Sequence, residues 1–159
     1  GLKVKQKIFC QLVVLIIIKS NLCLWLGIMI PDNIRKKIII GTWSLSGQYK
    51  AVSNKEVEEI VDLSLKNGFL EFDTSPTYGK GEKILSKFKK KNNKILINTK
   101  CGWDKTLKKT FEAKGLIEGI DRTLEKFDKI NVIQLHNPRN EIKNWDEIIE
   151  ILESYKKKN

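Results

Sequence analysis

The 159-residue sequence predicts an α/β fold in which about four β-strand and α-helix pairs form a parallel sheet covered by outer helices. Short runs rich in β-branched residues alternate with longer segments whose apolar residues recur at helical spacing, a pattern typical of parallel βα units. The four runs begin near residues 38, 69, 95 and 131. Each repeat is therefore close to the roughly 30 residues of a βαβ unit.

Local signals predict the individual elements. We expect strands over residues 38–40, 69–73, 95–100 and 132–136. The first helix should begin after Ser53, because Glu56 stands three residues later as in a capping box, and it should end at Gly68. A short helix is expected over residues 82–88. Two longer helices are predicted by apolar residues at helical spacing, with Leu116, Ile120, Leu124 and Phe127 in one, and with Trp145, Ile148, Ile149, Leu152 and Tyr155 in the other after a second capping box formed by Asn144 and Glu147.

Polar residues at the strand ends separate the two folds that share this pattern, a doubly wound sheet and a barrel. Asp73, Lys100 and His136 are the last residues of three consecutive predicted strands. This places them on the carboxyl-end rim, where (β/α)8 barrels carry their chemistry. A doubly wound dinucleotide domain would instead have a GxGxxG turn after its first strand, and the sequence GTW at residues 41–43 does not supply one. The sequence therefore favours a barrel.

The same rim predicts a proton-donating site built around Tyr78. A phenol ionises near pH 10, roughly, so a tyrosine that acts as an acid at neutral pH needs a cation to stabilise its phenolate. Lys100 can be that cation, and Asp73 can pair with Lys100. His136 can face the carbonyl group to which Tyr78 would give its proton. Taken singly, the aspartate could cap a loop, the lysine could be solvated and the histidine could be a core residue. Their joint spacing favours the chemical interpretation.

Composition narrows the classes of function. With 41% hydrophobic and 31% charged residues the chain is expected to be globular, and its net charge of +11 comes almost entirely from lysines scattered along helices. Such a distribution argues against a nucleic-acid groove. The three cysteines show no CxxC or Cys/His spacing, so we expect no disulfide framework, no metal site and a reducing, cytoplasmic location, with Cys101 a small buried hydrophobe rather than a thiol of the site.

Residues 1–28 differ from the rest of the chain. They contain four lysines, no acidic residue and two apolar blocks separated by Lys19-Ser20-Asn21. A lysine near the middle of a span costs about 3 kcal/mol on insertion scales, so a membrane tether is an alternative rather than the expectation. The only methionine is Met29, which stands directly before a sequence typical of a soluble domain. We therefore expect an apolar and basic extension over residues 1–28, which translation from Met29 would leave out, followed by a domain over residues 29–159.

Four motifs in this order resemble those of the aldo-keto reductase family. The segment FDTSPTYG at residues 72–79, followed by Glu82, resembles the second strand and loop of that family and is the most specific of the four. NTK at residues 98–100 resembles its third-strand lysine, QLHNP at 134–138 its fourth-strand histidine, and GTW at 41–43 its first turn. The resemblance covers about residues 34–159. It implies the N-terminal half of a TIM (β/α)8 barrel.

The resemblance also implies an activity and its residues. It implies an oxidoreductase that uses NADP(H) to reduce an aldehyde or ketone, or to oxidise the alcohol, with a small carbonyl or sugar-like substrate. Tyr78 would be the general acid and base, Lys100 and Asp73 would support it, and His136 would orient the carbonyl oxygen. Gly41, Thr42, Trp43 and Asp73 would contact the cofactor, and no metal is implied. Trp43 and Trp103 could line a substrate pocket or simply cover the mouth of the barrel.

Length leaves two interpretations open. A complete barrel needs eight strands and typically about 250 residues, whereas this chain supplies four units. The chain could be a fragment of such a reductase with impaired activity alone. Alternatively, it could be a non-catalytic half-barrel module that self-associates or pairs with a partner through its open sheet edges.

Overall fold

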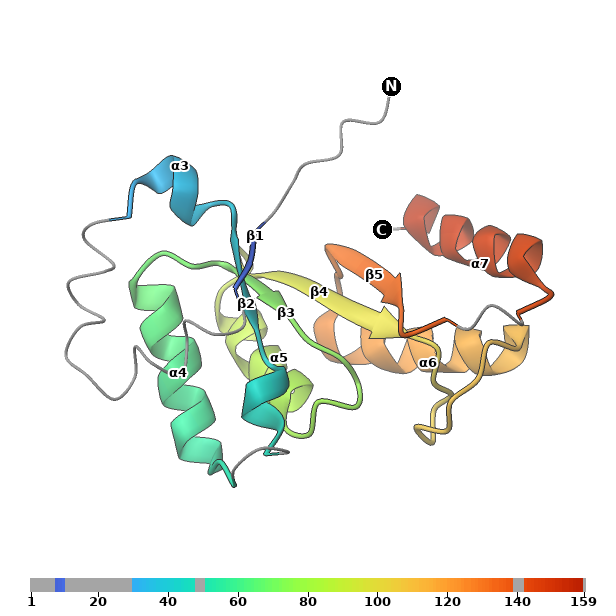
Figure 1. Cartoon of the computed structure of the whole chain (residues 1–159), viewed down its shortest axis with the longest axis horizontal. Coiled ribbons are helices and arrows are strands. Elements are labelled where there is room, and N and C mark those ends of the chain that lie inside the picture. Colours follow the sequence, from blue (N-terminus) through green and yellow to red (C-terminus); the bar gives the residue numbers. More distant parts are fainter. Residues whose placement is uncertain (1–7, 11–29, 48–50, 139–141, 159) are drawn as a thin grey trace.

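A computed structural model describes residues 8–10, 30–47, 51–138 and 142–158. The strands are β1 (Ile8–Cys10), β2 (Ile38–Gly41), β3 (Glu71–Asp73), β4 (Leu96–Cys101) and β5 (Val132–Leu135). The α-helices are α3 (Asp32–Arg35), α4 (Asn54–Lys66), α5 (Gly81–Lys91), α6 (Ala113–Phe127) and α7 (Trp145–Lys158), and a short 3-10 helix η1 covers Trp43–Ser46. Figure 1 shows their arrangement.

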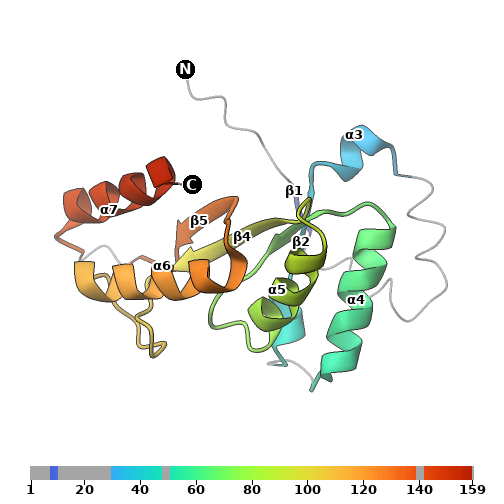
Figure 2. The same ribbon diagram turned by 180° about the vertical axis from the view of Figure 1, so that it is seen from behind.

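The sheet has five parallel strands in the order in which they occur along the chain, β1-β2-β3-β4-β5. Sequential order is the arrangement of a barrel, whereas a doubly wound sheet reverses its order at a switch point. In Figure 2, seen from behind, α5 and α6 lie in front of the strands. The four predicted βα units, β2-α4, β3-α5, β4-α6 and β5-α7, are therefore confirmed as an α/β fold with parallel strands.

The first strand was not expected from the sequence. Ile8–Cys10 lies within the N-terminal extension and pairs in parallel with β2, with Ile8 opposite Ile38 and Cys10 opposite Ile40. Three residues of the extension thus cover the β2 edge of the sheet. The remainder of residues 1–28 and Met29 lie outside the described residues, and the division of the chain at Met29 stays a prediction.

Alternation along the strands gives the sheet two different faces. Ile40, Phe72 and Ile97 point to the helix side, where they pack with Val57 and Leu85 of α4 and α5 in an apolar core. Because successive residues of a strand point to opposite faces, Glu71, Asp73, Asn98 and Lys100 face the other way. That second face is polar and mostly buried. It corresponds to the interior of a barrel.

The predicted helix boundaries agree with the structure to different degrees. Ser53 and Glu56 form the predicted capping box, with each side chain accepting a hydrogen bond from the other residue's backbone N–H. The last helix begins at Trp145, directly after Asn144 as predicted, and the Asn144 amide donates to the carboxylate of Glu147, the other residue of the predicted box, and to the carbonyl of Phe111. The short helix is longer than expected and covers Gly81–Lys91. A Glu82 at its first turn also suits the helix dipole.

Candidate active site

The predicted residues meet at the carboxyl end of the sheet. Asp73 is the last residue of β3, Lys100 lies one residue before the end of β4, and His136 directly follows β5. The backbone N–H of His136 donates to the carbonyl of Cys101, so the histidine stays in register with the end of β4. Parallel strands bring their carboxyl ends to one edge, which explains why residues 27 and more positions apart in the sequence lie together here.

Asp73 and Lys100 form the central ion pair of the site. The Lys100 ammonium donates to Asp73 Oδ2 at 2.7 Å and to the carbonyl oxygen of Thr74 at 3.0 Å. Burial raises the pKa of Asp73, and the hydrogen bond and charge of Lys100 oppose that rise. Asp73 Oδ1 is buried and has no hydrogen-bond partner among the described residues. One oxygen of this carboxylate thus fixes the lysine, while the other is an open acceptor.

Tyr78 lies in the loop between β3 and α5. Its ring is 4.8 Å from the Lys100 ammonium, measured to the ring centroid, and 5.9 Å from the imidazole of His136, centroid to centroid, in an edge-to-face arrangement. The loop turns at Gly79, whose φ is +54° and where a Cβ atom would lie 2.7 Å from the carbonyl oxygen of Ser46. Only glycine fits that position without strain. The structure therefore brings Tyr78, Lys100, Asp73 and His136 into one cluster.

His136 is held through one ring nitrogen. Its Nδ1 atom lies 3.1 Å from the hydroxyl of Ser75 and 3.3 Å from the indole N–H of Trp103. Burial, together with the positive charges of Lys100 and Lys109, lowers the pKa of His136. The imidazole is therefore neutral at neutral pH. Ser75 was part of the recognised motif, but no sequence signal paired it with a histidine 61 positions away.

The first turn contacts the site through Asp73. The backbone N–H and the hydroxyl of Thr42 both donate to the carbonyl oxygen of Asp73, at 2.9 and 3.0 Å, and Thr42 is buried. Gly41 pairs with Asp73 across the sheet, and Trp43 opens the 3-10 helix. The hydroxyl of Ser44, in the same turn, is also buried, and unlike that of Thr42 it has no hydrogen-bond partner among the described residues. This turn sets the position of β3, and it offers a ligand one unsatisfied group.

A buried carboxylate ties the Tyr78 loop to the strand that carries Lys100. Glu82, in the first turn of α5, accepts from the hydroxyl of Thr99 at 2.9 Å and from the Lys126 ammonium at 2.8 Å. Glu82 follows the motif that resembles the family's second strand and loop, but no sequence signal identified its partners. Since Thr99 precedes Lys100 and Glu82 follows the Tyr78 loop, this network fixes the relative position of the two proposed catalytic groups.

A second polar layer lies below the ion pair on the inner face. Glu71 accepts from Asn98 at 2.8 Å, and Asn131 donates to the amide oxygen of Asn98 at 2.9 Å. The sequence patterns did not lead us to expect this layer. The available signal was the two-residue period of a strand, since Glu71 and Asn98 each stand two positions before a predicted site residue.

The thiol of Cys101 lies in the apolar core. Cys101 packs with Leu116, Ile120 and Ile148, and burial raises the pKa of its thiol to about 12. In the described part of the chain no set of three or more His, Cys, Asp or Glu side chains is arranged to hold a metal ion. No helix among the described residues is long and apolar enough to span a membrane.

A parallel sheet in sequential order with polar residues gathered at its carboxyl end defines the chain as part of a (β/α)8 barrel. The aldo/keto reductase family profile matches residues 37–158. The chain therefore belongs to the aldo/keto reductase family. It is 27% identical over 139 residues to the chloroplastic pyridoxal reductase of Arabidopsis thaliana, an alignment covering 71% of this chain and 37% of that protein.

Solved structures show the same fold. Two structures of aldo-keto reductases from Pseudomonas aeruginosa superimpose with TM-scores of 0.62, at 21% and 20% sequence identity. Each comparison covers 76% of this chain, and 49% and 50% of the respective structures. This chain thus spans about half the length of the solved structures and just over a third of the curated relative. The prediction of a partial barrel of this family is confirmed.

Proposed function

We propose that this chain carries the proton-transfer residues of an NADP(H)-dependent oxidoreductase that interconverts an aldehyde or ketone and its alcohol. The observation that supports this most is the cluster of Tyr78, Lys100, Asp73 and His136 at the barrel rim. The family is one of oxidoreductases, and the name of the Arabidopsis relative specifies an aldehyde substrate, pyridoxal. A small carbonyl compound is accordingly the proposed substrate, and a cytoplasmic location remains part of the proposal.

The residues present fit part of a nicotinamide cofactor. Asp73 Oδ1 is an unsatisfied buried acceptor, which suits a ligand hydroxyl such as that of a ribose, and the unsatisfied hydroxyl of Ser44 lies in the neighbouring turn. Gly41 and Trp43 would border the same ligand, and Thr42 would act through its bonds to Asp73. When bound, the cofactor supplies or accepts the hydride. The preference for NADP(H) over NAD(H) follows from the family resemblance alone.

The protein residues would then manage the proton. The Tyr78 hydroxyl donates its proton to the carbonyl oxygen as that oxygen becomes an alkoxide, and Lys100 stabilises the phenolate that remains. Asp73 holds the ammonium in place at 2.7 Å. His136, neutral and edge-on to the Tyr78 ring, orients the same carbonyl oxygen. In the oxidation direction the phenolate takes the proton from the alcohol.

Replacing Tyr78 by phenylalanine tests this assignment. General acid catalysis typically contributes about 10²- to 10⁴-fold, so the variant should lose carbonyl reduction to that extent while still binding NADPH. NADPH fluorescence titration and reduction of an aldehyde panel that includes pyridoxal would be measured on the same samples. Carbonyl reduction that survives undiminished in the variant would defeat the assignment.

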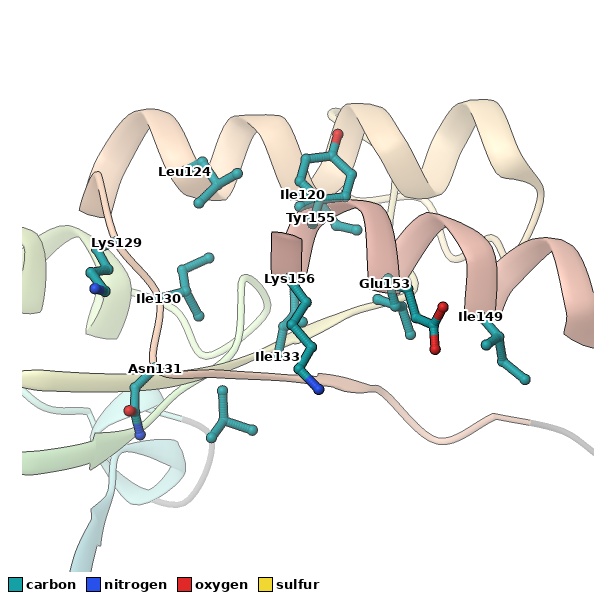
Figure 3. A pocket seen from close by; sticks show the side chains of 12 residues that line it. Ile120, Leu124, Lys129, Ile130, Asn131, Ile133, Ile149, Glu153, Tyr155 and Lys156 are labelled. Carbon is teal, nitrogen blue, oxygen red and sulfur yellow. The ribbon is translucent and has the colours of Figure 1, made fainter. Parts of the chain in front are cut away.

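A second candidate function is a half-barrel that assembles with another copy, and an apolar groove favours it. Figure 3 shows this groove of about 500 Å³, which is bordered by α6, by the approach to β5 and by α7. Ile130 and Ile133 line it on the sheet side, and Leu124 and Tyr155 on the helix side. β5 is the edge of the sheet among the described strands, and an uncovered parallel edge readily accepts another strand.

Sedimentation separates the two candidates. If the groove mediates assembly, Ile149→Lys should shift the chain toward monomer, because Ile149 lines the groove and is 50% exposed. Ile117→Lys is the matched control, since Ile117 is an exposed isoleucine of α6 outside this groove. A monomeric wild-type chain that binds NADPH would reject the assembly module and leave the oxidoreductase proposal standing.

A further inference from the structure

The geometry points to Trp103 as a positioning residue that selects the tautomer of His136 and leaves its Nε2–H free to donate to the substrate carbonyl oxygen. This inference deepens the proposed oxidoreductase function and rests on it for its catalytic meaning. The hydrogen-bond arrangement that carries the inference can be measured without cofactor or substrate.

The indole nitrogen of Trp103 fixes the direction of its hydrogen bond. An indole N–H is a donor and has no acceptor capacity. Because it lies 3.3 Å from Nδ1 of His136, that ring nitrogen must accept and must be unprotonated. In a neutral imidazole the proton is then on Nε2. The opposite tautomer would set two N–H groups against each other.

The surrounding hydroxyls are compatible with this assignment. The Ser75 hydroxyl, 3.1 Å from the same Nδ1, can donate to the single lone pair of that nitrogen together with the indole N–H, in a bifurcated arrangement. The Ser75 oxygen in turn can accept from Thr77, whose hydroxyl lies at 3.0 Å and whose backbone N–H donates at 3.4 Å. In the described residues Nε2 has no hydrogen-bond partner. The free nitrogen of the ring is therefore the protonated one.

The charges around the ring also favour its neutral form. Lys100 and Lys109 are the cations that face it, the Asp73 carboxylate is paired with Lys100, and Tyr78 lies edge-on at 5.9 Å between ring centroids. Burial and the two lysines lower the pKa of His136. The bond from Trp103 acts in the same direction, because protonation of Nδ1 would remove its acceptor. A neutral donor results, which polarises the carbonyl oxygen without supplying the proton that Tyr78 is proposed to give.

The position of Trp103 is built into the fold. It meets His136 edge-to-face, with ring centroids 5.7 Å apart and an interplanar angle of 85°. Its backbone pairs with Lys109 in a short antiparallel bridge, and α6 approaches it so closely that a Cβ at Gly119 would overlap the Trp103 carbonyl oxygen. The Lys109 ammonium lies 5.7 Å from the indole centroid. These contacts hold the indole against the histidine and explain the tryptophan better than a cover for the barrel mouth.

Nitrogen NMR of the histidine ring tests the inference directly. His136 is the only histidine of the chain, so ¹⁵N-histidine labelling of residues 1–159 gives one imidazole to assign. Above its pKa, Nε2 should show the shift of a protonated nitrogen and Nδ1 that of an unprotonated one. The indole N–H resonance of Trp103 should titrate together with His136, whereas that of Trp145, an exposed residue at the start of α7, should not.

Trp103→Phe removes the N–H and keeps an aromatic ring. We expect the ratio of the two tautomers to move toward Nδ1–H by about 2- to 10-fold, the range of one net hydrogen bond, and the pKa of His136 to rise. Trp145→Phe is the control and should change neither. A Nδ1–H tautomer in the wild-type protein, or a Trp103→Phe variant with unchanged ring shifts and pKa, would overturn the inference. The wild-type measurement decides even if the variant does not fold, and inactivity of Tyr78 variants bears only on the proposed function.

Discussion

Along the strand order, the two ends of the sheet, β2–β4 on one side and β5 on the other, differ in how completely they are packed. At one end, β2, β3 and β4 pack against α4 and α5 around eleven buried core residues. At the other, the cluster between β4, α6 and α7 contains four buried residues, and most of its members are partly exposed. Val132 of β5 and Ile149 of α7 are 39% and 50% exposed. Each βα unit is a parallel strand followed by a helix, so the difference in packing follows from the elements that lie beside each unit.

The comparison shows what a βα unit needs. A unit inside a barrel is covered on both sides by adjacent units, while β5 and α7 have a described neighbour on one side only. The proposed active site spans both ends, because Asp73, Tyr78 and Lys100 come from the well-packed end and His136 from the other. The contacts of Trp103 and Ser75 with the His136 ring, together with the hydrogen bond from the His136 N–H to the Cys101 carbonyl, join the two ends at the rim.

The largest expected effect comes from truncating one leucine at each end. Leu85 of α5 is completely buried, and Leu85→Ala should lower the free energy of unfolding by about 2–5 kcal/mol through lost transfer energy and a cavity. Leu152 of α7 borders the open groove, so Leu152→Ala should cost about 1 kcal/mol or less, since fewer contacts are lost. Urea unfolding of both variants measures the difference. Equal losses would show that the two ends are equally packed and would remove the basis of the comparison.

The well-packed end was the easier one to predict from sequence. The Ser53 and Glu56 box and the Gly68 stop are local signals, and α4 (Asn54–Lys66) forms between them because the information lies within one or two turns. The rim was predictable for a similar reason. Asp73 and Lys100 lie at or next to the ends of their strands, and parallel pairing brings strand ends together without further assumptions.

Contacts that depend on tertiary packing could not be predicted. β1 is a three-residue strand inside an apolar run, which has no periodicity to separate strand from helix. Trp103 and His136 are 33 positions apart, and Glu82 and Lys126 are 44 positions apart. Their contacts depend on how α6 and the segment closed by the Trp103–Lys109 bridge pack against the rim. Sequence patterns identify the face on which a residue lies but not its partner on another element.

The buried network of Glu82 should give the next largest effect. Glu82→Gln keeps the shape of the side chain but removes the charge that Lys126 contacts at 2.8 Å, so we expect a loss of about 1–2 kcal/mol, reduced because the Lys126 side chain is 36% exposed. Glu58→Gln is the matched control, because Glu58 binds Lys87 at 2.9 Å on the surface and should cost less than about 1 kcal/mol. Thermal and urea unfolding measure both losses. If the two variants lose the same stability, burial of Glu82 does not strengthen the link between α5 and α6.

The smallest expected effect is a pH dependence of stability that belongs to His136 alone. Its pKa in the folded protein lies below the ordinary value of 6.5, because burial, Lys100 and Lys109 disfavour the charged ring. The unfolded chain therefore binds the proton first as the pH falls below about 6.5, and the folded state loses stability until the pH has passed the lower folded pKa. His136→Gln should lack this component. The unfolding free energy of the wild type minus that of the variant should be constant above pH 7, roughly, and should decrease between that pH and the folded pKa of His136. A difference that grows as the pH falls through that range would mean that the folded protein stabilises the imidazolium, so that the less packed end of the sheet exposes the ring to water or to a carboxylate.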